Sequence, residues 1–335
     1  MKRIAVLDDY QGMVREMPGW DSLAARAQVD VFRDTLATND ALAARLEPYE
    51  ILAPIRERTR FPAELLERLP RLELLALAGR NTGQVDVAAA TARGVLVTES
   101  EGSGVGAVEL TMGLMLALVR RIPHEDRAIR EGRWQTGLGI ELAGKTLGIV
   151  GLGKIGRRIA AFGTLLGMMV LAWGPTLTPE RAAASQARYL PLDQLLAASD
   201  LVSLHLRLLD ATRGILGARE LALLKPTAYL VNTARGPLID EEALLAALRA
   251  RRFAGAALAV YAREPIPGDH PLLALDNVVL TPHVGFVTAE TYRAFYSQAA
   301  ESIGDFLGGR PPARLLNPEA LARVLRERGS RTMRA

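Results

Sequence analysis

The middle of the chain contains the sequence Leu147-Gly148-Ile149-Val150-Gly151-Leu152-Gly153-Lys154-Ile155-Gly156. A short apolar run leads into a G-x-G-x-x-G pattern, and a helical pattern follows it. Such a pattern needs Gly151 for a tight turn, Gly153 for a close backbone approach to a pyrophosphate, and Gly156 for helix–strand packing. The pyrophosphate would bind the amides of Lys154 and Ile155 at the positive end of the helix. The sequence therefore predicts a strand, a turn and a helix that hold a dinucleotide.

Short apolar runs alternate with helical patterns on both sides of this motif, over residues 4–98 and again over 146–280. This alternation predicts parallel sheets whose strands are joined by helices. Between the two series lies a long apolar helix, Ala107–Arg120, which we expect to connect two domains. The segment Ile122–Leu142 after it is expected to be loop-rich. A helix over Thr288–Leu307 is expected to return the chain to the first domain.

The length of the chain agrees with two domains, since 335 residues exceed the roughly 150 that are typical of one. We expect an α/β architecture with two doubly wound parallel-sheet domains. A Rossmann-type dinucleotide-binding domain over 105–285 would be inserted into a smaller, flavodoxin-like substrate domain made of 1–104 and 286–335.

The charge of the chain does not indicate a nucleic-acid partner. The formal net charge is +4, and the 41 basic residues are nearly all arginines that are interspersed with acidic residues. A nucleic-acid site would require a concentrated basic patch. The one basic run, from Arg323 to Arg334, is expected to be a solvated terminal tail.

Residue types that are missing or few exclude several other classes of site. The chain has no cysteine, which excludes disulfides, a thiolate nucleophile and cysteine-bound zinc. Its four histidines show no metal-ligand spacing, so we expect no metal. The first apolar run, Ile4–Leu7, is too short for a signal peptide, and no stretch approaches the ~20 apolar residues of a membrane span. We expect a soluble, cytoplasmic protein without a membrane partner.

The residue that usually selects the dinucleotide is replaced in this chain. The second strand of such a domain normally ends in an acidic residue about 20 positions after the glycines, and this residue binds the ribose hydroxyls. Here the strand Met169–Trp173 runs into Gly174. No carboxylate would repel a 2′-phosphate, yet no arginine directly follows to bind one, because Arg181 is seven residues on and Arg207 follows the next strand. The choice between NAD and NADP stays open, with NAD favoured because of the missing adjacent arginine.

Three groups with complementary chemistry follow in the second series: Arg235, Glu264 and His283. A guanidinium grips the two oxygens of a substrate carboxylate, and an imidazole can carry a proton at neutral pH. A carboxylate beside the imidazole holds its tautomer and favours its charged form. Alone, the histidine could cap a helix, the glutamate could be a surface residue, and Arg235 could pair with Asp240. Downstream of the glycine motif, the three groups indicate a hydride-transfer site.

Taken together, these features resemble the D-isomer-specific 2-hydroxyacid dehydrogenase family over nearly the full length of the chain. The matching motifs are Gly151-Leu-Gly-Lys-Ile-Gly156, Leu204-His205-Leu206, Thr212-Arg213-Gly214, Val231-Asn232-Thr233-Ala234-Arg235-Gly236, Glu264-Pro265 and Thr281-Pro282-His283. The resemblance implies a homodimer that uses a nicotinamide cofactor. It also implies Arg235 as the substrate-carboxylate binder, His283 as the acid/base and Glu264 as its partner.

The resemblance implies further contacts residue by residue. The turn Gly79-Arg80-Asn81 corresponds to one whose amides also hold the substrate carboxylate. Cofactor contacts are expected beyond the glycine turn at the following positions: Gly174, His205, Thr212, Thr233, Ala234 and Ala259. The chain departs from the family at Ala259, where an aspartate usually contacts the nicotinamide carboxamide, and at Arg207, which replaces a proline.

The function that these expectations favour is reversible hydride transfer between a nicotinamide cofactor and a small D-2-hydroxyacid or 2-oxoacid. Two alternatives stay open at this point. One is a dinucleotide-sensing regulatory protein on the same scaffold, which Gly174 and Ala259 leave possible. The other is a formate or phosphite dehydrogenase, for which no first-domain residues can be identified. The side chain of the substrate cannot be predicted, because the loops that would contact it carry no recognisable pattern.

Overall fold

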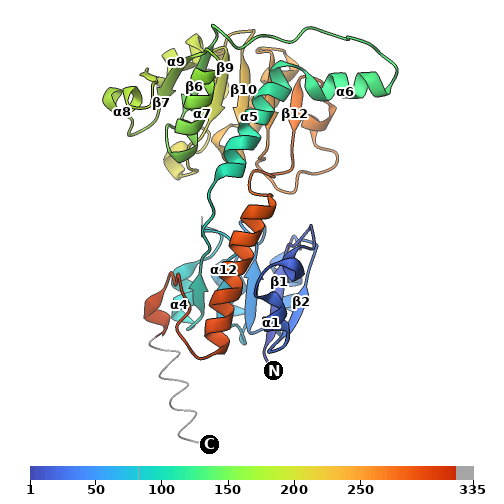
Figure 1. The fold of residues 1–335 in the computed structure, drawn as a ribbon, viewed down its shortest axis with the longest axis vertical. Helices are drawn as coiled ribbons and strands as arrows, with labels where there is room; N and C mark the ends of the chain where they lie inside the picture. The colour runs from blue at the N-terminus through green and yellow to red at the C-terminus, as the bar shows by residue number, and fades with distance from the viewer. Residues whose placement is uncertain (82, 322–335) are drawn as a thin grey trace, which may run out of the picture. The chain divides into compact units, whose positions relative to one another are not determined.

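The computed structural model describes residues 1–81 and 83–321. The chain divides into two compact units (Figure 1). Unit 1 comprises Met1–Ser103 and the described chain from Thr288 onward, and unit 2 comprises Gly104–Val287. The basic run from Arg323 to Arg334 lies outside the described residues. No described helix combines the length and apolarity that crossing a membrane requires.

Unit 1 contains a five-stranded parallel sheet of order β2-β1-β3-β4-β5. Its strands are β1 Arg3–Leu7, β2 Gln28–Val31, β3 Ile51–Pro54, β4 Leu74–Ala76 and β5 Leu96–Thr98. Strands β3, β4 and β5 are buried along their whole length, as expected for strands that are covered on both faces. The strand order is that of flavodoxin-like domains, which confirms the predicted class.

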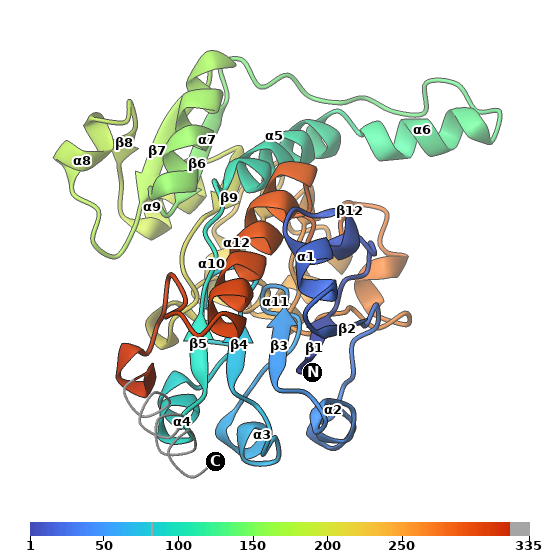
Figure 2. The same ribbon diagram turned by 60° about the horizontal axis from the view of Figure 1, so that its bottom comes forward.

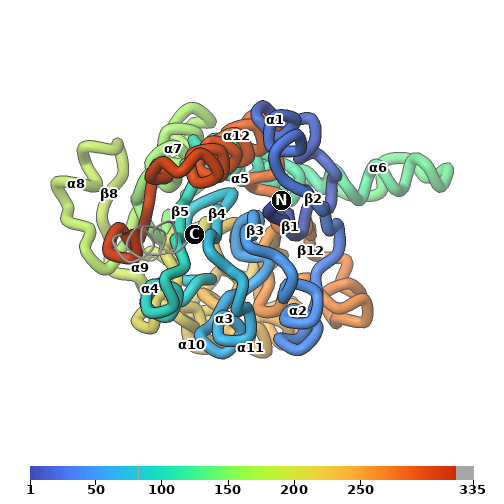
Figure 3. The backbone as a smooth tube through the Cα atoms, turned by 90° about the horizontal axis from the view of Figure 1, so that it is seen from below, coloured from blue at the N-terminus to red at the C-terminus, as the bar shows by residue number. Residues whose placement is uncertain are grey.

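Helices cover both faces of this sheet, as Figure 3 shows. They are α1 Trp20–Ala24, α2 Asn39–Leu46, α3 Ala63–Glu67, α4 Val87–Ala92 and α12 Ala289–Leu307, with the 3-10 turn η1 Val14–Glu16. The helix α12 belongs to unit 1 although unit 2 precedes it in sequence. Its Tyr296 packs edge-on against Trp20 of α1, with ring centroids 6.0 Å apart, and the Trp20 indole donates a 3.0 Å hydrogen bond to the Tyr296 carbonyl.

Unit 2 contains a seven-stranded parallel sheet of order β12-β11-β10-β9-β6-β7-β8. Its strands are β6 Thr146–Val150, β7 Met169–Trp173, β8 Arg188–Tyr189, β9 Leu201–Leu204, β10 Tyr229–Asn232, β11 Gly255–Leu258 and β12 Val278–Leu280. Six of these strands repeat the order of a dinucleotide-binding Rossmann sheet, and β12 extends it. The structure thus confirms two doubly wound parallel-sheet domains.

The helices of unit 2 enclose two apolar cores, one on each face of the sheet. They are α5 Val105–Val119, α6 Ile122–Arg130, α7 Lys154–Leu165, α8 Pro179–Ala183, α9 Leu192–Ala198, α10 Ala218–Ala222 and α11 Glu241–Arg249, with 3-10 turns η2 Asp210–Thr212, η3 Gly236–Leu238 and η4 Pro271–Ala274. One core contains residues of α5 and α7, and the other contains residues of α9, α10 and α11.

Two parts of unit 2 differ from the sequence-based expectation. The segment from Ile122 was expected to be loop-rich, but α6 forms over Ile122–Arg130. Pro123 favours its first turn, and the Arg130 guanidinium pairs with Asp126 one turn earlier, so local interactions support a helix with little buried surface. The short elements α8 and β8 were also not predicted, because five and two residues give too little periodicity.

Candidate active site

The glycine turn after β6 has the geometry that a pyrophosphate needs. Gly151 has a φ of +105°, and a Cβ added there would lie 2.7 Å from the carbonyl carbon of His205. A Cβ on Gly156 would lie 2.1 Å from the Gly151 carbonyl oxygen, so α7 can pack against the turn only without a side chain. By contrast, a Cβ on Gly153 would meet nothing within 4 Å. Neighbouring backbone atoms therefore leave no room for a side chain at Gly151 or Gly156, whereas the space at Gly153 is open.

The start of α7 is suited to hold the phosphates of a dinucleotide. The helix begins at Lys154, and no side chain caps it. The first amides of a helix have no partner within it and carry its partial positive charge. Gly153 immediately precedes Lys154 in the chain, so the open space at Gly153 adjoins these amides. The residues present therefore fit a dinucleotide, with Gly153, Lys154 and Ile155 in contact with its pyrophosphate.

The ribose position lies at the end of β7, beside the glycine turn. The Gly151 amide donates to the Trp173 carbonyl at 2.7 Å. A Cβ added to Gly174 would lie 3.5 Å from Leu177 Cβ and 4.0 Å from Gly151 Cα, both ordinary contacts. A side chain could therefore be accommodated at position 174, but this chain has none.

His205 and Thr212 occupy the loop after β9. Burial lowers the pKa of His205 to about 3, so the ring is neutral at physiological pH. Its Nε2 lies 2.9 Å from the Ser203 hydroxyl. The Thr212 hydroxyl accepts from the Leu209 amide at 2.8 Å and donates to the Arg207 carbonyl at 2.7 Å. In this structure Thr212 shapes the loop, and direct cofactor contacts of both residues stay predictions.

The loop that carries Arg235 is braced by a residue that sequence reasoning did not single out. Asn232 is 1% exposed at the end of β10. Its side-chain oxygen accepts from the Ala234 amide at 3.0 Å, and its side-chain nitrogen donates to the Arg235 carbonyl at 2.9 Å. The Thr233 hydroxyl bonds to that of Thr111 on α5 at 2.7 Å. An amide side chain directly after a buried strand was the available signal for this role.

The predicted histidine and glutamate are in direct contact. His283 Nδ1 lies 2.6 Å from Glu264 Oε2, and the two side chains are 24% and 33% exposed. The other glutamate oxygen, Oε1, accepts from the Tyr261 amide at 2.9 Å. The His283 backbone has a φ of 49°, and its ring packs edge-on against Phe286 at 5.7 Å. Both the carboxylate and the ring are therefore held in place.

The loops of Arg235, Glu264 and His283 begin at the same edge of the sheet. Asn232, Leu258 and Leu280 end β10, β11 and β12 in register. The first two loops also touch each other through their backbones: a Cβ on Gly236 would lie only 2.0 Å from the Tyr261 carbonyl carbon. Unit 2 thus gathers the three predicted groups on adjacent loops at the carboxyl edge of its sheet, where ligands bind in open α/β sheets.

Tyr261 connects the Glu264 loop to the strand before His283. Its hydroxyl donates to the Thr281 carbonyl at 3.0 Å and lies 3.3 Å from that of Leu258. Burial raises the pKa of Tyr261 to about 12, so the hydroxyl keeps its proton. Ala259, two residues earlier, is 2% exposed, and its amide donates to the Asn232 carbonyl at 3.0 Å. Its methyl group offers no polar atom to a carboxamide.

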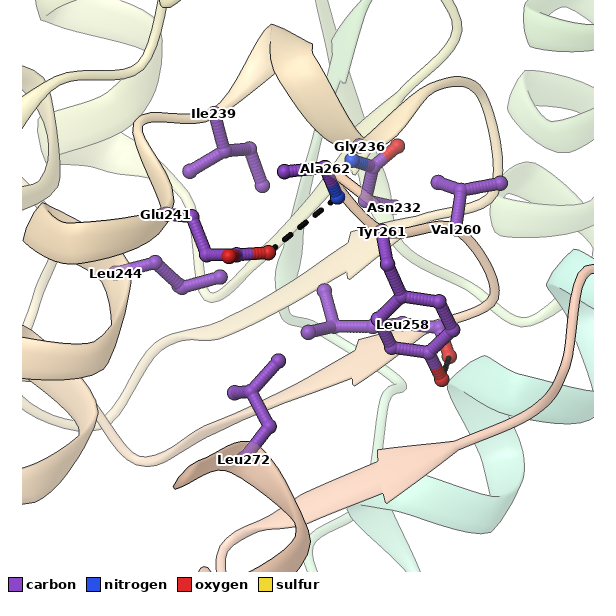
Figure 4. Close-up of a pocket in the computed structure, with 10 residues that line it drawn as sticks. All are labelled: Asn232, Gly236, Ile239, Glu241, Leu244, Leu258, Val260, Tyr261, Ala262 and Leu272. Atoms are coloured by element: carbon purple, nitrogen blue, oxygen red, sulfur yellow. Dashed lines mark hydrogen bonds between the residues drawn. The ribbon is translucent and has the colours of Figure 1, made fainter. Parts of the chain in front are cut away.

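A small pocket lies behind these loops (Figure 4). It is lined by Asn232, Gly236, Ile239, Glu241, Leu244, Leu258, Val260, Tyr261, Ala262 and Leu272. Glu241, the first residue of α11, accepts from the Ala262 amide at 3.3 Å. Its other carboxylate oxygen lies 3.2 Å from His270 Nε2, and His270 Nδ1 accepts from the Leu272 amide. This second glutamate–histidine pair braces the Glu264 loop from behind, and sequence reasoning missed it.

The turn Gly79-Arg80-Asn81 belongs to unit 1 and follows β4. Gly79 has a φ of +133°, which favours glycine. The Arg80 guanidinium pairs with the Glu101 carboxylate on the surface. The Asn81 amide donates to the Glu99 carboxylate at 3.2 Å. One amide predicted to hold a substrate carboxylate thus binds a carboxylate of the chain itself.

Known proteins resemble this chain in sequence and in structure. Residues 112–285 match the NAD-binding domain of the D-isomer-specific 2-hydroxyacid dehydrogenases. A glyoxylate reductase from Aeropyrum pernix is 40% identical over 293 residues, which cover 82% of this chain and 88% of that protein. A solved phosphoglycerate oxidoreductase from Vibrio cholerae superposes with a TM-score of 0.88 at 39% identity, covering 92% of this chain and 100% of that one.

Other relatives are longer proteins. A D-3-phosphoglycerate dehydrogenase from Archaeoglobus fulgidus is 36% identical over 283 residues, which cover 84% of this chain but 54% of that protein. The chain thus spans about half the length of these relatives. Three findings point to the same family: the matching domain, the sequence identity over most of the chain and the common fold. The chain therefore belongs to the D-isomer-specific 2-hydroxyacid dehydrogenase family and is an NAD-dependent oxidoreductase that transfers a hydride between a nicotinamide and a 2-hydroxyacid or 2-oxoacid.

Proposed function

We propose that this chain reduces a small 2-oxoacid to the D-2-hydroxyacid, reversibly, with His283 as acid/base, Glu264 as its partner and Arg235 as the carboxylate binder. The observation that carries this proposal is the 2.6 Å contact between His283 Nδ1 and Glu264 Oε2. It leaves Nε2, on the other side of the ring, as the atom that exchanges a proton with substrate.

Each group has a distinct task in the reaction. The bound nicotinamide supplies or accepts the hydride. Arg235 binds the carboxylate of the substrate and so fixes the neighbouring carbon in an orientation suited to hydride transfer. In reduction, His283 donates a proton from Nε2 to the carbonyl oxygen, and in oxidation the neutral ring takes a proton from the hydroxyl. Glu264 holds the ring and stabilises its protonated form.

A turn of unit 1 is the other proposed carboxylate binder. We propose that the amides of the Gly79-Arg80-Asn81 turn also bind the substrate carboxylate. The support for this is the Asn81 amide, which already binds a carboxylate oxygen of Glu99 at 3.2 Å. A substrate would have to displace that contact. The Arg80 side chain is 58% exposed in its pair with Glu101, so it is also accessible to an anion.

Glyoxylate is the first substrate to test, because this chain covers 88% of the length of a relative named glyoxylate reductase. D-3-phosphoglycerate is the second, because relatives named for it are 36% identical. The purified protein would be assayed with NADH and NADPH against a panel of 2-oxoacids, and with NAD and D-3-phosphoglycerate in the opposite direction, by absorbance of the reduced nicotinamide. Turnover of a small 2-oxoacid supports the proposal. Cofactor binding without any turnover would favour a dinucleotide-sensing role instead.

We also propose a homodimer formed through α6 and the loop that follows it. In Figures 1 and 2, α6 extends from α5 away from the strands of unit 2. This arm carries large apolar side chains in solvent, namely Ile122 (53% exposed), Ile129 (55%), Trp134 (74%) and Leu138 (95%). Such a gathering of exposed apolar residues is typical of an interface, and a second copy is the simplest partner because a twofold interface uses the same surface twice.

Sedimentation equilibrium tests the dimer. The wild type is expected to be a dimer at micromolar concentration, and the double variant Trp134→Ser with Leu138→Ser a monomer. Leu209→Ser is the matched control, since Leu209 is also an exposed apolar residue of unit 2, at 59%, but lies outside the arm. A monomeric wild type, or a double variant that stays dimeric, would contradict this interface.

A further inference from the structure

We propose that this NAD-binding domain binds NADPH as well as NADH, and that Arg181 is the residue that accepts the 2′-phosphate. Binding of the dinucleotide does not require the substrate proposed above. A failure of the proposed substrate would therefore leave the role of Arg181 untouched.

The first observation is the geometry at the end of β7. Val150 and Trp173 are in register at the ends of β6 and β7. Gly174 comes next, and a Cβ there would lie 4.0 Å from the Gly151 Cα in the glycine turn. A carboxylate at this position would accept the ribose hydroxyls and repel a 2′-phosphate. Since Gly174 carries no side chain, the position excludes neither dinucleotide.

The second observation is the path of the chain after Gly174. Thr178 caps α8, with its hydroxyl accepting from the Arg181 amide at 3.3 Å. The short helix turns the chain back, so that Arg181 Nη1 donates to the Thr176 carbonyl at 2.7 Å. A guanidinium seven positions away in sequence therefore lies against the carbonyl two residues after Gly174. The sequence alone showed only that Arg181 is seven residues after Gly174 and left the choice of dinucleotide open.

The third observation is the charge of this edge. Arg181 is exposed and forms no ion pair within residues 1–81 and 83–321. The one hydrogen bond of its side chain leaves most of its five N–H donors available. The neighbouring acidic residue is Glu180. Hydrogen bonds from its own amide and from the Thr178 side chain lower the pKa of its carboxyl, as expected for an acid at the start of α8. Lys154 adds a second cation at the start of α7. An arginine with available donors, bonded to a carbonyl two residues after a strand end that lacks the usual acid, is suited to a phosphate.

Dissociation constants for NADH and NADPH, measured by nicotinamide fluorescence without substrate at one fixed salt concentration, test the proposal. For the wild type we expect the two constants to agree within about tenfold, a difference of less than 1.4 kcal/mol. Arg181→Gln is expected to raise the dissociation constant for NADPH by about fivefold or more while changing that for NADH by less than about twofold. Arg251→Gln is the matched control, because it removes one exposed cation of the same unit that pairs with Asp276 instead.

A second variant tests the same site from the opposite direction. Gly174→Asp restores the usual carboxylate at a position where a Cβ makes only ordinary contacts. It should raise the dissociation constant for NADPH by more than about tenfold, while NADH should bind as well as before or better. Gly174→Ala adds the Cβ without charge and should change neither constant by more than about twofold. The proposal is overturned if the wild-type protein binds NADPH more than about tenfold more weakly than NADH, or if Arg181→Gln weakens the binding of both dinucleotides equally.

Discussion

His283 Nδ1 lies 2.6 Å from one oxygen of Glu264. The other oxygen of that carboxylate accepts the Tyr261 amide at 2.9 Å. The glutamate is therefore fixed by the main chain on one side and fixes the imidazole on the other. The ring can then present only Nε2 to a substrate, which is the orientation that the proposed proton transfer needs.

Arg235→Lys is expected to be far more damaging than its conserved charge suggests. An ammonium cannot make the two parallel hydrogen bonds of a guanidinium to a carboxylate. We expect kcat/KM for the best 2-oxoacid to fall by more than about tenfold, in line with a bidentate contact of ~1.5–3 kcal/mol. Arg251→Lys, on an exposed arginine that pairs with Asp276, should leave the kinetics unchanged. A fall of less than about threefold for Arg235→Lys would exclude a bidentate contact.

Gly236→Ala should separate the Arg235 loop from the Glu264 loop. The added methyl group would lie 2.0 Å from the Tyr261 carbonyl carbon, so one backbone has to move. We expect a loss of about 1–3 kcal/mol in stability together with a large loss of kcat. Gly268→Ala is the control, because a Cβ there meets nothing within 4 Å. Thermal unfolding and steady-state kinetics measure both effects, and a fully active Gly236→Ala would show that the backbone contact does not position the site.

Much of this arrangement could be predicted from the sequence, for identifiable reasons. The glycine turn and the succession of strands and helices along the chain follow from local patterns, and Arg235, Glu264 and His283 stand in recognisable motifs after strand ends. What the sequence could not supply was contact between distant residues. The Glu241–His270 pair joins residues 29 positions apart with no motif around them. Arg181 reaches Thr176 only because the five-residue helix α8, too short to predict, turns the chain back.

His205 should make the protein less stable as the pH falls. Burial lowers its pKa to about 3, whereas an unfolded histidine titrates near 6.5. Below pH 6.5 the unfolded chain gains a proton that the folded chain does not, so stability is lost between about pH 6.5 and 3, by at most ~1.4 kcal/mol per pH unit. We expect His205→Gln to lose less stability than wild type between pH 7 and 5 in thermal unfolding. Parallel losses in wild type and His205→Gln would show that His205 is not a buried neutral ring.

The pH dependence of the reaction in both directions tests the roles of His283 and Glu264 most directly. Reduction needs the ring protonated and oxidation needs it neutral. Hence kcat/KM should fall with rising pH for 2-oxoacid reduction and rise for hydroxyacid oxidation, through one shared midpoint where chemistry is rate-limiting. Glu264→Gln keeps the shape of the side chain but removes the charge that stabilises the imidazolium, so both midpoints should move to lower pH.

The control is Glu220→Gln, which alters a carboxylate of unit 2 that pairs with Arg219 on α10 and should leave the midpoint of the profile in place. We expect the midpoint to shift to lower pH in Glu264→Gln, in both directions and by the same amount. An unmoved midpoint in Glu264→Gln would contradict it, because the carboxylate 2.6 Å from His283 would then have no influence on the proton that this ring transfers.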